Sequence, residues 1–170
     1  MAPGYSPAMS FTIDSTPQSY AFLSLDLQLS GTSSSANVTP SIWNNVSGHP
    51  GSRLLTLNSV SVTGSTPTTY TVSVPNLTLN ANATYWIVLD GAIATSWTTT
   101  LSESETSSGS WTIGNSLYET VDSGATWQLA ETIEVAKFGI NTIVIPEPSS
   151  IALAIAGFGG ALLWRRRAAV

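Results

Sequence analysis

Leucine alternates with polar residues without a break from Leu23 to Leu29, and no other part of the sequence constrains the fold as strongly. Leu23, Leu25, Leu27 and Leu29 fall on one side, and Ser24, Asp26 and Gln28 fall on the other. A period of two residues is typical of a β-strand with one buried face, because successive side chains of a strand point in opposite directions. The run therefore predicts a strand whose four leucines enter a shared core.

Apolar and β-branched segments of similar length recur along the chain, separated by Gly, Pro and Asn. The further predicted strands are Val38–Trp43, Leu54–Val62, Tyr70–Val74, Thr84–Leu89, Trp97–Leu101, Ser110–Ile113, Ser116–Val121, Trp127–Leu129, Ile133–Phe138 and Thr142–Ile145. Asn44–Gly51 contains Gly48, Pro50 and Gly51 and is predicted to be a loop. Short strands with turns at intervals of about 8–12 residues are typical of all-β sandwiches and jelly rolls. We therefore expect an all-β fold, an antiparallel β-sandwich or jelly-roll-like domain.

The composition excludes several classes of function. The 170 residues include no cysteine, so disulfides, thiol catalysis and cysteine-ligated metals are excluded. Ten acidic residues against five basic ones argue against a nucleic-acid partner, which requires a basic face. His49 is the only histidine, which excludes histidine-rich metal sites. We expect no cofactor and no metal, and the low content of charged residues, with 26 Ser and 22 Thr, favours an exported protein.

The C-terminal segment differs from the rest of the chain in both charge and hydropathy. In order, it contains the tripeptide Pro146, Glu147 and Pro148, the uncharged segment from Ile151 to Trp164, and the cluster Arg165, Arg166 and Arg167. Counted with the two preceding serines, the apolar segment reaches about 24 Å as a helix, slightly less than the roughly 30 Å of a bilayer core. We expect residues 149–170 to form a single C-terminal transmembrane helix followed by an arginine-rich tail, with the arginines in the cytoplasm. A buried core helix is the alternative, which the three consecutive arginines disfavour.

This ordered triplet at the chain end resembles the PEP-CTERM sorting signal of Gram-negative bacteria. The resemblance implies recognition by an exosortase, a membrane protease-transpeptidase that cuts near the tripeptide. It also implies export across the inner membrane, anchoring in the lipid bilayer through the C-terminal helix, and then a place at the cell surface or outside the cell. Proteins of this kind usually accompany exopolysaccharide production, and here the tripeptide is a processing handle and not a catalytic site.

The body of the chain resembles the choice-of-anchor R domain, whose molecular function is unknown, through LSLDLQLSG, SIWNNVSGHPGSRLLTL and LTLNANATYWIVLDG. The expected organisation is a disordered start over residues 1–9, a β-sandwich domain over 10–140, a linker with the tripeptide over 141–148, and the membrane segment over 149–170. The start lacks the apolar segment of a signal peptide, so we expect a leader upstream of Met1, with tail anchoring as the alternative.

The segment Thr120–Trp127 resembles an Asp box, a hairpin of the pattern S/T-x-D-x-G-x-T-W. Asp122 is suited to capping the turn, Gly124 supplies a positive φ, and Trp127 is expected to pack beneath. A single copy does not indicate a propeller, so we interpret it as a structural hairpin and not a ligand site.

Other candidate sites are weaker. Glu103 and Glu105 lie two residues apart and have the residue type of a glycosidase pair, but a solvated strand edge is the alternative that we favour. His49 lies between Gly48 and Pro50, and no nucleophile elbow accompanies it. Six tryptophans and five tyrosines suit stacking on sugar rings, although core packing explains most of them. We therefore expect a non-enzymatic surface protein, with a surface-displayed polysaccharide-binding module as the alternative.

Overall fold

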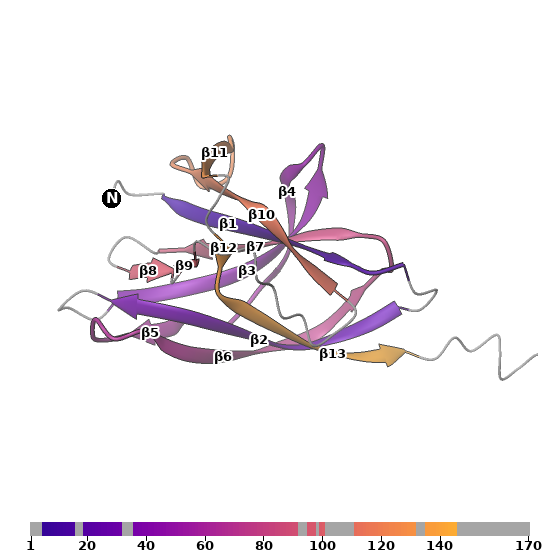
Figure 1. Cartoon of the computed structure of the whole chain (residues 1–170), viewed down its shortest axis with the longest axis horizontal. Coiled ribbons are helices and arrows are strands. Elements are labelled where there is room, and N and C mark those ends of the chain that lie inside the picture. Colours follow the sequence, from indigo (N-terminus) through magenta and orange to yellow (C-terminus); the bar gives the residue numbers. More distant parts are fainter. Residues whose placement is uncertain are drawn as a thin grey trace, which may run out of the picture.

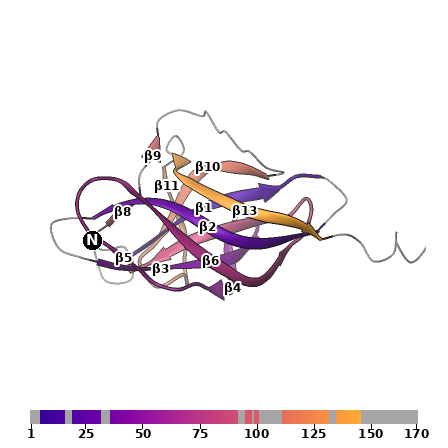
Figure 2. The same ribbon diagram turned by 90° about the horizontal axis from the view of Figure 1, so that it is seen from below.

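The computed structural model describes residues 5–15, 19–31, 36–91, 95–97, 99–100, 111–131 and 135–145. These residues form an all-β fold in which every pairing of neighbouring strands is antiparallel. Figures 1 and 2 show two sheets packed face to face as a sandwich. The predicted all-β class is confirmed. Within the described ranges, no helix has the length and hydropathy needed to cross a membrane.

The larger sheet contains the strands in a non-sequential order. Along it lie β11 (Gln128–Glu131), β10 (Trp111–Thr120), β1 (Ser6–Ile13), β7 (Thr84–Asp90), β3 (Ala36–Val46) and β4 (His49–Thr56), with β5 (Val60–Val62) paired to β3. β1 lies between β10 and β7 in the middle of this sheet, and it begins at Ser6. The folded domain therefore starts before residue 10, where we expected it to start.

The smaller sheet covers one face of the larger one. It contains β13 (Phe138–Ile145), β2 (Ser19–Gly31) and β6 (Thr68–Leu79), with β8 (Thr95–Trp97) paired to β2. A short pair of strands, β9 (Thr99–Thr100) and β12 (Val135–Ala136), completes the described elements.

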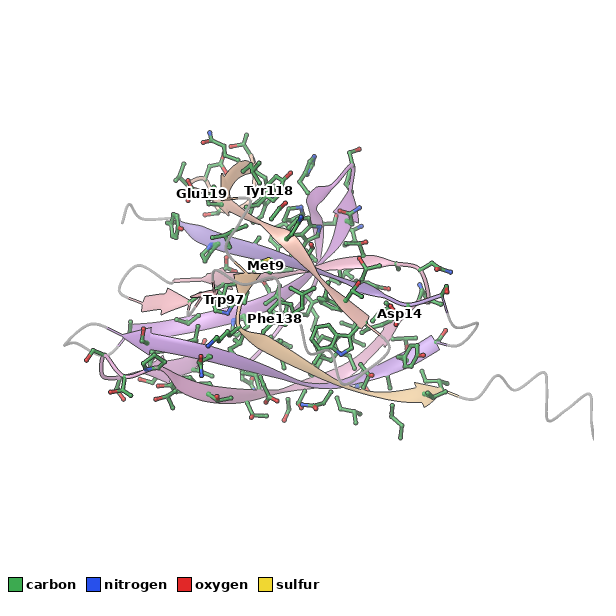
Figure 3. All side chains as sticks on the ribbon, in the orientation of Figure 1. Met9, Asp14, Trp97, Tyr118, Glu119 and Phe138 are labelled. Carbon is green, nitrogen blue, oxygen red and sulfur yellow. The ribbon has the colours of Figure 1, made fainter. Side chains whose placement is uncertain are left out.

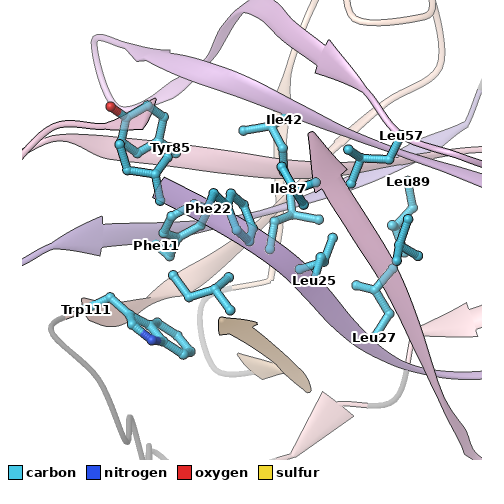
Figure 4. Packing of buried hydrophobic residues seen from close by; sticks show 14 of the residues in the cluster. Phe11, Phe22, Leu25, Leu27, Ile42, Leu57, Tyr85, Ile87, Leu89 and Trp111 are labelled. Atoms are coloured by element: carbon cyan, nitrogen blue, oxygen red, sulfur yellow. The ribbon is translucent and has the colours of Figure 1, made fainter. Parts of the chain in front are cut away.

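The core lies between the two sheets, as Figure 4 shows for Phe11, Phe22, Leu25, Ile42 and Ile87 among others. The Phe11 ring of β1 contacts aromatic rings from both sheets. Its centre lies 5.7 Å from that of Tyr85, in the larger sheet, in a stacked arrangement, and 6.0 Å from that of Phe22, in the smaller sheet, edge to face. Each fully buried side chain of this size contributes roughly 1.5–3 kcal/mol. The core therefore joins strands that are far apart in the sequence.

The predicted alternation in β2 is confirmed for Leu25, Leu27 and Leu29, which are completely buried, but it is wrong for Leu23. That side chain is 49% exposed. The pairing of β2 with both β13 and β6 skips Leu23 and resumes with Phe22, which is buried instead. A β-bulge at Leu23 thus shifts the alternation by one residue and moves this leucine to the outer face.

Several predicted strand boundaries also differ from the structure. The expected loop Asn44–Gly51 is a tight hairpin in which only Ser47 and Gly48 separate β3 from β4. Both residues have a positive φ, 52° and 87°, as a type I′ turn requires. Pro50 is accepted because β4 is an edge strand, where one backbone N–H is not needed for pairing.

Two further strand predictions are corrected. The expected strand Leu54–Val62 is interrupted at residues 57–59, which separate β4 from β5. The two expected strands Ser110–Ile113 and Ser116–Val121 belong to one strand, β10, which is irregular where it passes Ser10.

Candidate functional site

The Asp-box hairpin connects β10 to β11 and is organised by the carboxylate of Asp122. Asp122 Oδ1 accepts hydrogen bonds from Thr120 Oγ1 at 2.6 Å and from the Thr126 backbone N–H at 2.9 Å. Asp122 Oδ2 accepts one from Thr126 Oγ1 at 2.6 Å. The backbone N–H of Gly124 donates to Thr120 Oγ1 at 3.0 Å. Asp122 and Thr120 together hold the turn closed.

These contacts set the acidity of the carboxyl group. The hydrogen bonds from Thr120, and then from Thr126, favour the ionised form and hold the pKa of Asp122 well below its usual range. Because both carboxylate oxygens accept hydrogen bonds from within the loop, the geometry supports the structural interpretation of Asp122.

Gly124 and Trp127 attach this hairpin to the large sheet. Gly124 has a φ of 93°, and a Cβ atom at this position would lie 2.6 Å from Trp43 Cη2. The Trp127 ring packs edge to face on the same Trp43, with ring centres 5.7 Å apart. The expected packing of Trp127 beneath the hairpin therefore involves β3, a strand about eighty residues earlier in the chain.

A second apolar cluster, on the outer face of the large sheet, was not predicted from the sequence. We call it the outer aromatic cluster; its members are Ala8, Trp43, Trp86 and Val88, with Tyr118 and Trp127 packed against them. The signal for it was the run Thr84–Leu89, which is apolar at successive positions, as expected for a strand covered on both faces.

Charged groups border this cluster at β4 and β7. The Arg53 guanidinium lies over the Trp43 ring, 5.1 Å from its centre. Arg53 Nη2 also lies 3.0 Å from Asp90 Oδ2, and Ser6 Oγ donates to Asp90 Oδ1 at 3.0 Å. Arg53 therefore links the β3–β4 hairpin to β7, and Asp90 in turn accepts a hydrogen bond from β1.

The remaining catalytic candidates do not come together in the described residues. His49 Nδ1 lies 3.2 Å from the carbonyl oxygen of the adjacent Pro50, inside its own hairpin. Glu103 and Glu105 lie outside the described residues. In the part of the chain that the structure describes, no three His, Asp or Glu side chains are grouped as metal ligands.

The predicted sorting signal begins where the described fold ends. Ile145 is the last residue of β13 and pairs with Ser19 of β2. The tripeptide Pro146–Pro148, the apolar segment Ile151–Trp164, the arginines Arg165–Arg167 and the expected transmembrane helix lie outside the described residues. The tripeptide therefore follows β13 with no intervening residue.

Comparison with known families identifies one segment. Residues 144–167 match the model of the PEP-CTERM protein-sorting motif, which confirms the sorting signal predicted from the tripeptide, the apolar segment and the arginines. No curated protein and no solved structure matches the chain, so the resemblance of the body to the choice-of-anchor R domain stays a prediction.

Proposed function

We propose that this chain is an exported, non-enzymatic surface protein whose C-terminal signal is processed by an exosortase at or near Pro146–Pro148. The observation that carries the proposal is the match of residues 144–167 to the PEP-CTERM protein-sorting motif. That motif implies an exosortase as the processing partner and membrane association before processing. The β-sandwich is the part that is delivered to the surface, and the C-terminal segment is the signal that directs its sorting.

The order of the three parts of the signal suits this role physically. Two prolines disfavour a helix or a central strand through the tripeptide, which leaves it extended for a protease to bind. The 14 uncharged residues from Ile151 to Trp164 suit a helix within the bilayer. Arg165–Arg167 then stay in the cytoplasm by the positive-inside rule, and residues 1–145 lie on the other side.

Among the described acidic residues, Asp122 has the most strongly perturbed pKa, and its contacts support a non-enzymatic body. Asp122 has a strongly lowered pKa, which in other settings is a sign of a functional site. Here the cause is a set of hydrogen bonds within the hairpin, and the same bonds hold the turn closed. Turn formation accounts for the perturbation without a substrate.

The decisive experiment is mass spectrometry of the C-terminus of the mature protein, isolated from a host with an active exosortase. We expect a C-terminus near Pro146–Pro148 and loss of Arg165–Arg167. Glu147→Ala tests recognition of the tripeptide, and the same host without its exosortase gene is the control. An intact Val170 in the exosortase-containing host would overturn the proposal.

A second candidate for the body is a polysaccharide-binding module displayed at the surface. The outer aromatic cluster favours it, because it gathers Trp86 and Tyr118 on the face of the large sheet that the small sheet does not cover. Aromatic side chains with a polar surround are the usual means by which proteins bind sugar rings. This candidate is compatible with exosortase sorting, which would determine only where the module is displayed.

A further inference from the structure

A hollow of about 260 Å³ opens on the outer face of the large sheet, beside the outer aromatic cluster. Its walls come from four strands and from the turn of the β3–β4 hairpin, and they are formed by Ser10, Thr12, Asn45, Gly48, Thr84, Trp86, Asn115, Ser116 and Tyr118. Because a water molecule takes about 30 Å³ in the liquid, the hollow holds roughly nine waters' volume. We refer to it as the outer hollow.

The hollow exists because β1 carries small side chains between two strands with large ones. Ala8 pairs with Tyr118 on one side and with Val88 on the other, and Ser10 pairs with Trp86. Of the two small side chains, Ser10 lines the hollow, and its small size leaves space between Trp86 and the residues of β10. Figure 3 shows Tyr118 on the side of the large sheet away from Phe138, which lies between the sheets.

An irregularity in β10 shapes the other wall. The pairing of β1 with β10 passes from Met9–Leu117 to Phe11–Ile113, so Ser10 faces the three residues Gly114–Ser116. A Cβ atom at Gly114 would overlap Ser10 Oγ, so glycine at this position lets the two strands approach without a rotation of the Ser10 side chain. Bulges of this kind are common beside binding sites because they redirect side chains. Here Asn115 and Ser116 line the hollow.

The aromatic pair is held in a defined arrangement. Trp86 is buried, and its Nε1 donates to Asn45 Oδ1 at 2.9 Å, which fixes the indole plane. The half-buried Tyr118 ring stands edge to face against it, with centres 5.2 Å apart at 81°. Trp86 therefore forms the fixed base, and Tyr118 is the ring available to a ligand.

The polar groups of the hollow are neutral. Thr12 and Thr84 share a hydroxyl–hydroxyl hydrogen bond of 2.8 Å, and the amide nitrogen of Asn45 remains for donation since its oxygen accepts from Trp86. Asp, Glu, Lys and Arg do not occur among the lining residues. Hydroxyls and amides next to an aromatic ring match an uncharged ligand rich in hydroxyl groups, whose polar groups need partners and whose C–H face needs an apolar surface.

Another hollow on the smaller sheet has a different chemistry. It measures about 230 Å³ and contains Asp26 and Lys137 among its lining residues. The Asp26 carboxylate already accepts hydrogen bonds from Thr71 at 2.6 Å and Asn141 at 3.1 Å. A site with fixed charges of both signs suits a neutral polymer less well than the outer hollow does.

We propose that the outer hollow is a binding subsite for one ring of a neutral polysaccharide, with Tyr118 stacking on the sugar and Asn45, Asn115 and the Thr12–Thr84 pair binding its hydroxyls. This proposal rests on the second candidate function and names the site that would perform it. It does not depend on the processing of the C-terminal signal.

The test is affinity electrophoresis of the full chain in gels that contain dextran or galactomannan, with alginate as an anionic probe and tryptophan fluorescence as a second readout. We expect retardation by a neutral polymer and none by alginate. Tyr118→Ala and the exposed Asn115→Ala should each weaken the affinity, about tenfold for the tyrosine. Gln28→Ala, which lines the hollow of the smaller sheet, is the matched control and should bind normally.

The outcomes separate the site from the function. Binding that is lost in the Tyr118 and Asn115 variants, with unchanged thermal unfolding of Asn115→Ala, supports the subsite. If binding persists in both variants, or is lost only with Gln28→Ala, the outer hollow is not the binding subsite, although the body still binds polysaccharide. If neither neutral polymer retards the chain, both the subsite and the polysaccharide-binding function are wrong. If alginate retards it more strongly than the neutral polymers do, the proposal that the ligand is neutral is wrong.

Discussion

Gly124 illustrates how a single residue connects local conformation to long-range packing. Its φ of 93° and its contact with Trp43 both require the absence of a side chain. We expect Gly124→Ala to destabilise the fold by about 2–3 kcal/mol, from backbone strain and displacement of the tryptophan. Urea unfolding checks the value.

Gly48→Ala is the matched control for this substitution. Gly48 has a nearly equal φ of 87°, but a Cβ atom there would meet no atom within 4 Å in the described structure. We expect a cost of about 1 kcal/mol from the backbone alone. Equal losses in the free energy of unfolding for the two substitutions would show that the contact between Gly124 and Trp43 does not contribute to stability.

Asp122 makes the stability of the hairpin depend on pH. Because the pKa of Asp122 is lowered in the folded protein, the unfolded chain takes up this proton at a higher pH than the folded chain does. The contribution of the Asp122 carboxylate to the free energy of unfolding is complete above the usual carboxyl pKa. It is lost as the pH falls from about 4 towards the pKa that Asp122 has in the folded protein.

The prediction is tested with Asp122→Asn. Its deficit in unfolding free energy should be largest at neutral pH and should shrink between about pH 4 and pH 2. Thr126→Val removes one donor to the carboxylate and should reduce the same pH dependence in part. A deficit that stays constant over this range would contradict the prediction.

At the scale of elements, β2 shows that the same residue type has opposite roles within one strand. Leu25→Ala should destabilise the protein by about 2–5 kcal/mol, because it leaves a cavity in a closed core. Leu23→Ala should cost less than about 1 kcal/mol, because the bulge places this leucine on the outer face. Thermal or urea unfolding of the two variants compares them directly, and a similar loss in both would contradict the bulge.

The same strand explains what sequence periodicity can predict. Alternation identified β2 and the buried Leu25, Leu27 and Leu29, because the period of two is a local property of the extended chain. It failed at Leu23, because a bulge changes which face a residue takes without changing the sequence pattern. The hairpin residues Asp122, Gly124 and Trp127 were found for the same local reason, while the partner of Trp127, Trp43, required the tertiary fold.

The outer hollow lies beyond such reasoning. Apart from Gly48 in the β3–β4 turn, its residues come from β1, β3, β7 and β10, which are neighbours only in the order β10-β1-β7-β3. Nothing in the local pattern of Ser10 or Tyr118 indicates that order. The sorting signal is the opposite case: all of its parts lie within one short contiguous segment, so the motif was predicted from the sequence and is confirmed by the match of residues 144–167.

At the scale of the whole molecule, the described residues end with β13 at Ile145. The core clusters of the described residues run from Ala8 to Ile140, and β13 pairs with β2 along its length up to Ile145. We expect a chain that ends at Pro148 to keep the midpoint of thermal unfolding of the full chain in detergent. A chain that ends at Lys137 lacks β13 and should not fold cooperatively.

Circular dichroism during heating compares the two truncations. Retained cooperativity in the chain that ends at Lys137 would show that β13 is dispensable. Loss of cooperativity in the chain that ends at Pro148 would show that the tail stabilises the body, and the separation of the β-sandwich from the signal would then be wrong.

The position of Ile145 at the end of β13 allows other segments to be fused to the sandwich. A polypeptide joined after this residue extends from the end of an edge strand and requires no change in the pairing of β13 with β2. A lipid anchor, a membrane segment or a receptor-binding peptide fused there is expected to leave the sandwich unchanged. In the laboratory, the position is a natural fusion point for a purification tag or a display anchor.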